Sequence, residues 1–330
     1  ASLIDNKKKT VFKAFSFSNS VDGAEKLISK IEPFSESIEI GMEATGHYWL
    51  SLYSYLSEKG FTIRVINPIQ TDGWRQGIEI RKRKTDIIDS LLIADLLRYG
   101  DFVETSLTNE DYLSLRNLCR FRSYLISSIG DLKRKTIALL DQVFPEYASS
   151  FSDVFGKTSK EILSNFSSPQ DFEDIDSKGL SDFLKNVTMK QFAKRKLQEL
   201  SKKATNSFGV NFCLDSFSLQ IKMLIEQINF IQSQVIEVEN EIERLLSKLD
   251  SPITTIPGIG SITGATILGE IGDISRFSNP SKLVAYAGLD ASVSKSGEYE
   301  STINRMSKRG SPYLRRALFQ SALVAAFNDP

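Results

Sequence analysis

Residues 37–68 read SIEIGMEATGHYWLSLYSYLSEKGFTIRVINP, and their pattern decides the fold of the first part of the chain. Apolar and polar side chains alternate in SIEIGME, residues 37–43, which predicts a strand. The next segment, HYWLSLYSYLSEKG, has the periodicity of an amphipathic helix and ends on Gly60 at the C-cap position. FTIRVINP then predicts a second strand that stops at Pro68. A strand, a helix and a strand in this order are typical of an α/β layer fold.

The same alternation continues on both sides of this stretch. VFKAFSF, residues 11–17, predicts an earlier strand after the turn DNKKKT, and VDGAEKLISKI, residues 21–31, predicts a helix. Beyond Pro68, a loop with a basic run leads to a helix that begins near Thr85. We therefore expect an α/β domain over residues 1–106.

Helical patterns replace the strand signals over residues 107–250. Residues 145–215 are polar, rich in Ser, Asp and Phe, and indicate no particular element. After them, apolar residues recur at alternating spacings of three and four, which predicts a coiled coil over about residues 218–249. A core helix of a bundle would show the same seam, whereas β-branched residues at most a positions favour a two-stranded coiled coil and thus a dimer. The seam consists of Ile221, Leu224, Ile228, Ile231, Val235, Val238, Ile242, Leu245 and Leu249.

The last segment, residues 251–330, is expected to form a mainly helical domain. Pro257, Gly258 and Gly260 interrupt an apolar run there and lead into a new helix. The pattern is similar to a helix-hairpin-helix element, whose backbone N–H groups can bind a phosphate without reading bases. An ordinary turn before a helix would have the same sequence, so this motif alone leaves both interpretations open.

Composition limits the class of protein. The chain has 330 residues, 41% of them hydrophobic and 25% charged, as in globular proteins of two or three domains. Its 41 basic and 41 acidic residues cancel, so the net charge favours no class of partner. No apolar run approaches the roughly 20 residues that cross a bilayer, and the first residues lack the apolar stretch of a secretory signal. We therefore expect no membrane partner and a cytoplasmic location. Two cysteines and a single histidine exclude a Cys/His zinc site, so any metal must be bound by oxygen.

Basic residues gather in four clusters along this neutral chain. Such clusters are most often solvated helix faces, but four of them are also typical of a surface that follows phosphates. The clusters are Arg75 with residues 81–84 around Trp74, residues 133–135, residues 194–196, and Arg305, Lys308, Arg309, Arg315 and Arg316.

Three acids form a candidate metal site. Asp86 and Asp89 are three residues apart at the start of a predicted helix, so their carboxylates share one face. Glu43 lies at the carboxyl end of a predicted strand, where open α/β sheets place their ligands. Carboxylates gathered from a strand and a helix repel one another unless a cation such as Mg²⁺ binds them. The alternative is that Asp86 is only a helix N-cap or first-turn residue favoured by the helix dipole, and that Asp89 is a solvated neighbour.

Five segments in the same order carry a resemblance to a known family. Together they resemble the DEDD transposases of the IS-one-ten type, insertion-sequence recombinases with an amino-terminal RuvC-like domain of the RNase H fold and a carboxyl-terminal transposase domain. The resemblance covers both ends of the chain and leaves out the polar middle. The segments are MEATGHYW, INP, RKRKTDIIDSLLIADLLR, IPGIGSITGATILGEIGDISRF and KLVAYAGLDASVSKSGEYESTINRMSKRGSPYLRRAL.

This resemblance implies four catalytic residues. The family's glutamate falls on Glu43 and its two helix aspartates fall on Asp86 and Asp89, which would bind Mg²⁺. Its catalytic serine falls on Ser296, in the loop after AYAGL, which would attack the scissile phosphate and hold the cut strand covalently. The neighbouring serines that compete by composition alone are Ser292, Ser294 and Ser301.

The resemblance also implies partners. Members of the family are guided by a structured RNA that pairs with donor and target DNA, and they act as homodimers that assemble into tetramers. A prokaryotic, nucleoid-associated protein is therefore expected, with Tyr48 and Trp49 packed in the core. The residues expected to contact nucleic acid are Arg81, Lys82, Arg83, Lys84, Gly258, Gly260, Arg305, Lys308, Arg309, Arg315 and Arg316.

Two departures from the family pattern affect these expectations. The family's first aspartate lies on an opening strand, and we expect no such strand here, because Asp5 falls in the hairpin turn. The chain also stops where relatives continue, so we expect a fragment that binds metal poorly and cleaves weakly. The alternative functions are a RuvC-like Holliday-junction nuclease that uses water, and a non-catalytic dimer that binds nucleic acid.

Overall fold

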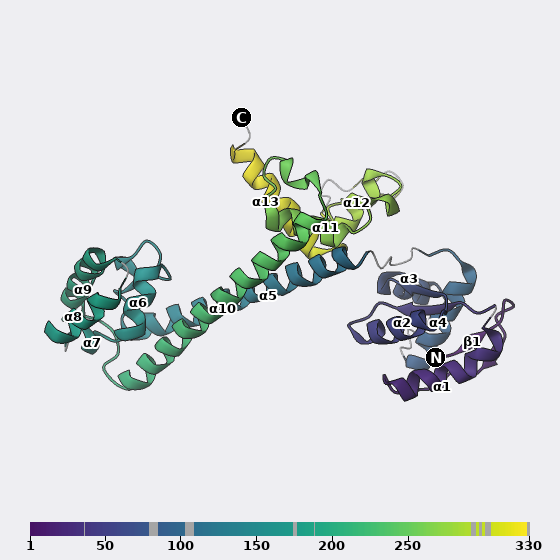
Figure 1. Ribbon diagram of the computed structural model, residues 1–330, viewed down its shortest axis with the longest axis horizontal. Coiled ribbons are helices and arrows are strands. Elements are labelled where there is room, and N and C mark those ends of the chain that lie inside the picture. Colours follow the sequence, from purple (N-terminus) through teal and green to yellow (C-terminus); the bar gives the residue numbers. More distant parts are fainter. Residues whose placement is uncertain are drawn as a thin grey trace. The chain divides into compact units, whose positions relative to one another are not determined.

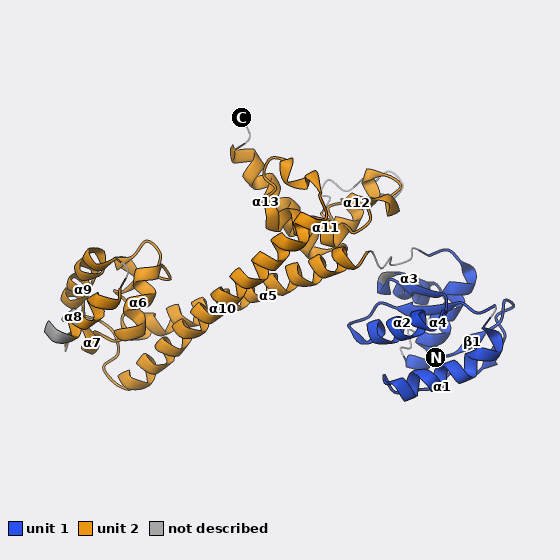
Figure 2. Ribbon diagram, in the orientation of Figure 1, with its two compact units in different colours: residues 1–107 blue, residues 108–330 orange. Residues whose placement is uncertain are grey.

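The computed structural model describes residues 1–35, 37–78, 85–102, 109–173, 177–187, 189–291, 295–296, 299–300 and 305–328. The chain divides into two compact units, Ala1–Leu107 and Thr108–Pro330 (Figure 2). The first unit combines short strands with helices, and the second is built mainly of helices (Figure 1). Among the described residues, no helix is long and apolar enough to cross a membrane.

The first unit contains the strand, helix and strand predicted for residues 37–68. Strands β3 (Ile40–Glu43) and β4 (Ile63–Ile66) pair in parallel, and α2 (Tyr48–Glu58) connects them. A right-handed crossover through a helix is the usual way to join neighbouring parallel strands. The other elements are β1 (Leu3–Ile4), β2 (Thr10–Phe12), α1 (Val21–Ile31), the 3₁₀ turn η1 (Glu32–Phe34), α3 (Pro68–Ile78) and α4 (Asp86–Tyr99).

The described strands of the first unit form two separate sheets of two strands each. Strand β1 pairs antiparallel with β2, which corrects the expectation that no strand precedes this hairpin turn. The strand expected over residues 11–17 is shorter and ends at Phe12. The α/β character of the unit is therefore present, while a single RNase H-like sheet remains a prediction.

A small apolar core holds the first unit together. Leu27 and Ile31 of α1 pack with Leu56 of α2 and with Met42 and Ile63 of the parallel strands. Ser20 caps α1 by accepting a hydrogen bond from the backbone N–H of Gly23, which fixes the start of that helix.

The expected burial of the aromatic pair after β3 is wrong for its first member. Tyr48 is 68% exposed at the start of α2, and Trp49 is partly buried. Tyr48 is the first residue of α2, where the preceding loop ends. Its ring can lie in solvent because only the later turns of the helix face the core.

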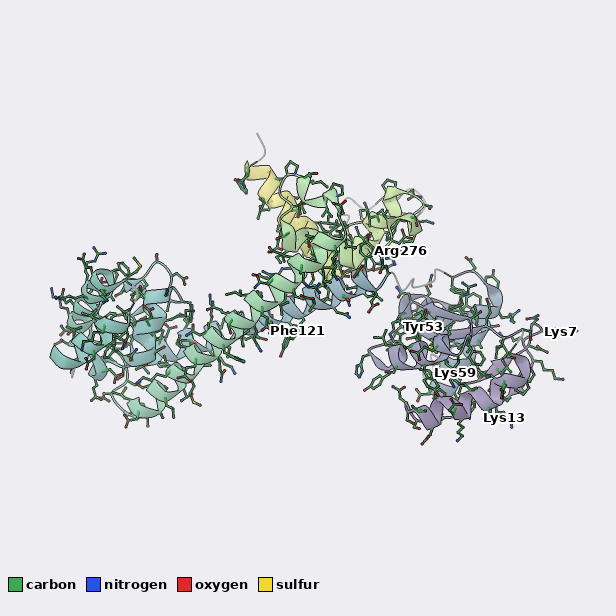
Figure 3. All side chains as sticks on the ribbon, in the orientation of Figure 1. Lys7, Lys13, Tyr53, Lys59, Phe121 and Arg276 are labelled. Atoms are coloured by element: carbon green, nitrogen blue, oxygen red, sulfur yellow. The ribbon has the colours of Figure 1, made fainter. Side chains whose placement is uncertain are left out.

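Two long helices, α5 (Glu110–Val143) and α10 (Leu214–Lys248), pack along each other in the second unit (Figure 1). Five residues of the predicted α10 seam are buried, and the other four are partly buried. The buried ones are Ile221, Ile228, Val235, Ile242 and Leu245, and the partly buried ones are Leu224, Ile231, Val238 and Leu249; Ile225, outside the predicted seam, is fully buried. Helix α5 of the same chain covers this seam, so the seam itself is no evidence for a second subunit. Phe121, on α5, is 47% exposed (Figure 3).

Residues 145–215, for which the sequence indicated no element, form a compact helical bundle. Aromatic rings make up much of its core, including Phe144, Tyr147 and Phe172, which are almost completely buried. The Tyr147 hydroxyl hydrogen-bonds with Ser159 at 2.9 Å, so its polar end is satisfied inside the core. The elements are η2 (Ala148–Ser150), α6 (Lys157–Asn165), α7 (Pro169–Glu173), α8 (Ser177–Asn186) and α9 (Lys190–Ala204).

The last part of the second unit packs against the end of the long helix pair. Helix α11 (Ser261–Ile271) contacts both α5 and α13 (Pro312–Asn328). Gly269 is required in α11 because an added Cβ would lie 2.7 Å from the backbone nitrogen of Arg116. The remaining elements are η3 (Pro252–Thr255), η4 (Ile274–Arg276), α12 (Pro280–Ala287), β5 (Lys295–Ser296) and β6 (Tyr299–Glu300).

Candidate active site

Glu43 lies at the carboxyl edge of the parallel strand pair, at the end of β3 and opposite Ile66 of β4. One carboxylate oxygen accepts a short hydrogen bond from the Thr45 hydroxyl. The other accepts a 2.9 Å hydrogen bond from the hydroxyl of Thr71, a buried residue of α3. Both carboxylate oxygens are therefore satisfied by neutral donors.

The two helix aspartates lie in the first turns of α4. Thr85 is the N-cap, because its hydroxyl accepts a hydrogen bond from the backbone N–H of Ile88, so Asp86 is not the capping residue. Asp86 is exposed and close enough to the Ala1 ammonium to interact with it electrostatically. Burial lowers the pKa of that ammonium, and the charge of Asp86 opposes the shift.

Asp89 is mostly covered and pairs with a cation of the protein. Arg75 donates a hydrogen bond from Nη2 to Asp89 Oδ1 at 2.9 Å, and their side chains are only 11% and 19% exposed. The arginine also approaches Asp72 at 3.5 Å. The charge of Asp89 is therefore compensated without a metal ion.

Helix α3 brings Glu43 and Asp89 to one side of the fold. Their partners, Thr71 and Arg75, are four residues apart on α3, so they share a face at a separation of about 6 Å along the helix axis. Sequence reasoning assigned neither α3 residue to these acids, and it placed Arg75 only in a basic cluster. The segment TDGWR, residues 71–75, gives no sign of a site, because the acids that Thr71 and Arg75 contact lie on other elements.

The carboxylates of Glu43, Asp86 and Asp89 are chemically suited to Mg²⁺, but their arrangement in the described structure does not form a site for it. Carboxylate oxygens are the ligands that this hard cation prefers. Among the residues that the structure describes, no group of three or more Asp, Glu, His or Cys side chains is placed to hold a metal ion. Hydroxyl groups and Arg75 donate hydrogen bonds to oxygens of Glu43 and Asp89, and Asp86 interacts electrostatically with the ammonium of Ala1.

Asp95 is a second buried acid on α4. It lies in the apolar run SLLIADLLRY, where a lone acid is itself a signal for a paired, buried charge. It is 4% exposed and accepts hydrogen bonds from Lys8 at 2.8 Å and Arg98 at 2.9 Å. Burial alone would raise the pKa of Asp95, but the hydrogen bonds from the two cations outweigh it and hold this pKa below its usual value.

Asp5 lies in the hairpin turn between β1 and β2. Its Oδ1 accepts hydrogen bonds from the backbone N–H groups of Lys7 and Lys9, at 2.9 and 2.8 Å, as in an Asx turn. The same turn reaches Asp95 through Lys8. The turn that holds Asp5 therefore contacts α4 at Asp95, which is nine residues, or about 13 Å along the helix axis, beyond Asp86. The described structure thus does not gather Asp5 with the other acids.

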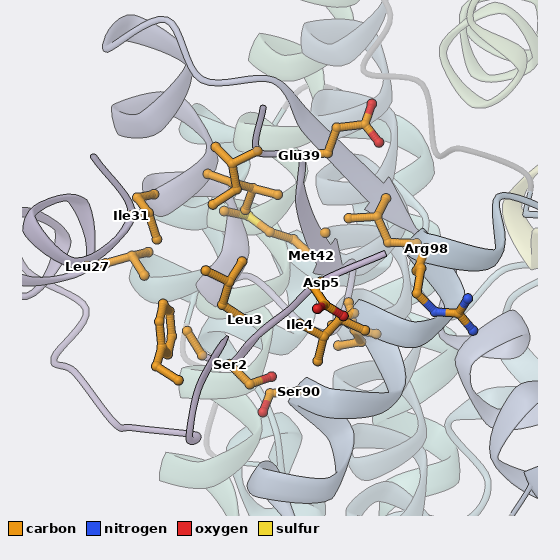
Figure 4. A pocket seen from close by; sticks show the side chains of 18 of the residues that line it. Ser2, Leu3, Ile4, Asp5, Leu27, Ile31, Glu39, Met42, Ser90 and Arg98 are labelled. Atoms are coloured by element: carbon orange, nitrogen blue, oxygen red, sulfur yellow. The ribbon is translucent and has the colours of Figure 1, made fainter. Parts of the chain in front are cut away.

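A cavity of about 340 Å³ lies between β1, β3 and α4 (Figure 4). Leu3, Ile4 and Met42 project into it, with Asp5 and Arg98 nearby. Strands β1 and β3 both line this cavity. They do not pair with each other, and each belongs to a separate sheet.

The predicted nucleophile, Ser296, lies in the second unit. It is the last residue of β5 and pairs with Tyr299 of β6, so its backbone is part of a hairpin instead of an irregular loop. Its side chain lies outside the described part of the structure, as do Ser292, Ser294 and Ser301. The base of the hairpin segment is held by a bridge between Ala291 and Met306.

The predicted nucleic-acid contacts have different environments. Residues 81–84 lie outside the described residues. Arg305, Lys308, Arg309 and Arg316 are exposed, but Arg315 donates a hydrogen bond to the carbonyl of Ala287 at 3.1 Å.

The proposed phosphate-binding hairpin is partly covered. Gly258 has a φ of +82°, and an added Cβ would lie 2.3 Å from the carbonyl oxygen of Ser321 in α13. The N–H of Gly260 donates to the Thr263 hydroxyl at 3.2 Å. Helix α13 therefore packs against one side of this turn, and one of its N–H groups already has a partner.

The domain that contains Ser296 also contributes to a buried ion pair, which was not anticipated from the sequence. Glu270 of α11 is 2% exposed and binds Arg120 of α5 through two hydrogen bonds, at 2.6 and 2.9 Å. Ser311, at the start of α13, donates to the same carboxylate at 2.8 Å. An acid inside the apolar run SITGATILGEI was the available signal. The network joins α5, α11 and α13.

Comparison with known proteins identifies both ends of the chain. Residues 1–145 match the family model of the DEDD transposase domain of the IS110 type, described as a transposase. Residues 250–330 match the family described as Transposase IS116/IS110/IS902 family. Both ends of the chain are thus similar to domains of IS110-family transposases. Residues 146–249, which include the helical bundle and the whole of α10, lie between the matched regions.

Curated relatives agree with this family. The chain is 25% identical over 256 residues to the insertion element IS110 uncharacterized 43.6 kDa protein of Streptomyces coelicolor, covering 75% of this chain and 62% of that protein. It is 32% identical over 103 residues to the transposase for insertion sequence element IS1328 of Yersinia enterocolitica, covering 31% of this chain and 30% of that protein. It is 23% identical over 293 residues to the pilin gene-inverting protein of Moraxella bovis, covering 89% of this chain and 69% of that protein. The chain thus spans less than two thirds of the length of the first two relatives.

Proposed function

We propose that this protein is a transposase or site-specific recombinase of an insertion sequence, which cuts and rejoins DNA. The observation that carries the proposal is the pair of transposase matches at residues 1–145 and 250–330. A relative named for inverting the pilin gene supports it, because an inversion requires that DNA be cut and rejoined.

Ser296 is the proposed nucleophile. Its Oγ would form a bond to the phosphorus of the scissile phosphodiester while the bond from phosphorus to one deoxyribose oxygen breaks. The serine proton passes to a base and the released deoxyribose oxygen takes up a proton. The product is a phosphodiester between Ser296 and DNA, which a DNA hydroxyl can attack in the reverse sense to rejoin a strand.

Glu43, Asp86 and Asp89 are the proposed ligands of Mg²⁺, which would stabilise negative charge on the phosphate when bound. Arg75 and two threonines already donate hydrogen bonds to oxygens of Glu43 and Asp89, so a metal ion would share these carboxylates with them. An RNase H-like arrangement of residues 1–106 is part of the same proposal, with a helical region over residues 107–250 and a transposase domain over residues 251–330.

The proposed partners are donor and target DNA, a structured guide RNA and further copies of the chain. The exposed cations Lys308, Arg309 and Arg316 support a contact with phosphates in the domain of Ser296. A DNA substrate would place the protein with the nucleoid of a prokaryotic cytoplasm.

Trapping a covalent adduct tests this function. The chain is incubated with labelled duplexes that carry the element's ends, together with the RNA encoded beside them, and is then denatured and separated by size. A DNA adduct is expected with the unaltered chain and with Ser292→Ala or Ser294→Ala, and none is expected with Ser296→Ala.

Two other results would contradict the proposal. Free DNA ends without an adduct would indicate a nuclease that uses water, such as a junction resolvase. Binding without any cleavage, equal in the unaltered chain and in Glu43→Ala, would indicate a non-catalytic protein.

A further inference from the structure

Helix α9 (Lys190–Ala204) of the helical bundle is strongly basic. Its sequence, KQFAKRKLQELSKKA, contains six cations and a single acid, Glu199. The helix is amphipathic, and Ala193, Leu197 and Leu200 are buried in the bundle core. Because the apolar face is fixed in the core, the orientation of the opposite face is fixed as well.

The single acid of α9 is neutralised by the cations at the edge of the core. Lys196 and Lys203 both pair with Glu199, at 2.8 and 3.3 Å. Hydrogen bonding by Lys196 is the largest cause that lowers the pKa of Glu199, to about 2. Lys203 also donates to Ser149 and Ser150, at 2.9 and 2.8 Å. These two lysines are thus committed to the bundle itself.

The remaining four cations lie on the outer face. Lys190, Lys194, Arg195 and Lys202 are exposed, and none of them pairs with an acid among the residues that the structure describes. The Arg195 guanidinium lies 5.5 Å from the centre of the Phe192 ring, which limits where it can point. The outer face therefore carries uncompensated positive charge, although the whole chain is neutral.

We propose that this outer face of α9 binds the phosphate backbone of duplex DNA. From Lys190 to Lys202 the helix rises about 18 Å, and a DNA strand presents a phosphate every 3.4 Å or so along its axis. Long lysine side chains spaced by one or two helical turns can therefore reach several phosphates. The exposed amides of Gln191 and Gln198 lie between them as further donors.

The choice of DNA as the occupant rests on the proposed function, because the surface chemistry alone recognises phosphodiesters. Lysines are point charges without the fork geometry that reads base edges, so this contact is independent of sequence. The helix lies outside both matched transposase regions, so it adds a DNA contact to those of the matched domains.

A salt series of binding measurements tests the inference. The whole chain is titrated into a labelled duplex of arbitrary sequence, and fluorescence anisotropy is measured between about 50 and 200 mM salt. The variant Lys190→Gln, Lys194→Gln, Lys202→Gln should bind at least about tenfold more weakly, and its slope of log K against log salt should fall by about 2 to 3, since each lost phosphate contact removes about 0.9.

A matched variant separates this surface from total charge. Lys157→Gln, Lys185→Gln, Lys222→Gln removes the same charge from the same unit but leaves α9 intact, and its affinity should change less than about twofold. Equal losses in both variants would overturn the inference. A loss confined to a labelled RNA duplex of the same sequence would also overturn it. The readout needs no cleavage, so a loss of binding that persists in Ser296→Ala would support the α9 surface even if the proposed recombination failed its own test.

Discussion

Arg75 donates a hydrogen bond from Nη2 to Asp89 Oδ1 at 2.9 Å, and both side chains are largely buried. The Arg75 guanidinium thus lies on the side of Asp89 that faces α3. Thr71, which donates a hydrogen bond to Glu43, is four residues before Arg75 on the same helix. A bound divalent cation and Arg75 would compete for the same carboxylate, because each compensates the same charge.

Replacing Arg75 should therefore strengthen metal binding. In Arg75→Gln, we expect the affinity for Mg²⁺ to rise severalfold, because Asp89 loses the cation that compensates its charge. Isothermal titration of the whole chain with Mg²⁺ measures the change. Arg64→Gln, which removes a surface pair with Glu39 in the same unit, should leave the affinity unchanged. An unchanged or weaker affinity in Arg75→Gln would show that Asp89 is a structural partner only.

Asp95 should make the stability of the first unit depend on pH. Hydrogen bonds from Lys8 and Arg98 hold its folded pKa below the usual value near 3.8, so its stabilisation is present above that value and is lost as the pH falls through the folded pKa. In Asp95→Asn, we expect lower stability at neutral pH and a shallower loss of stability toward acid. Urea denaturation at a series of pH values measures both.

The control for this pH dependence is Asp101→Asn, at an exposed position of the same unit. It should keep the acid-dependent loss of stability. If Asp95→Asn lost stability toward acid as steeply as the unaltered chain, another group would be responsible.

Glu270 should be among the most important charges for the stability of the second unit. Glu270→Gln leaves Arg120 without its charged partner, and we expect a loss of about 2 to 3 kcal/mol, reduced by the partial exposure of Arg120. The midpoint of thermal or urea unfolding measures the loss. Glu241→Gln removes an exposed pair with Arg244 and should leave the unfolding midpoint almost unchanged. Equal effects of the two substitutions would mean that the buried network contributes no more than a surface pair.

Short-range features of the fold were accessible from the sequence. The helix predicted over residues 21–31 has those bounds, and α4 begins one residue after Thr85, whose hydroxyl caps it. The polar composition of residues 145–215 concealed a bundle, because its phenylalanines are scattered along the sequence and gather only in the folded core. The candidate site was predicted in part: Glu43 and Asp89 approach the same face of α3, but nothing in the sequence indicated Thr71 and Arg75 as their partners.

The sequence by itself determined the bounds of α1, the start of α4 and which residues resemble those of a transposase, since periodicity, capping and motifs are properties of neighbouring residues. Only the tertiary structure decided that α5 of the same chain covers the α10 seam, that Arg75 compensates Asp89 and that Glu199 is neutralised while the outer cations of α9 are not. The physical reason is that a charge or an apolar face acquires its partner through burial, and burial depends on residues that are far apart along the chain.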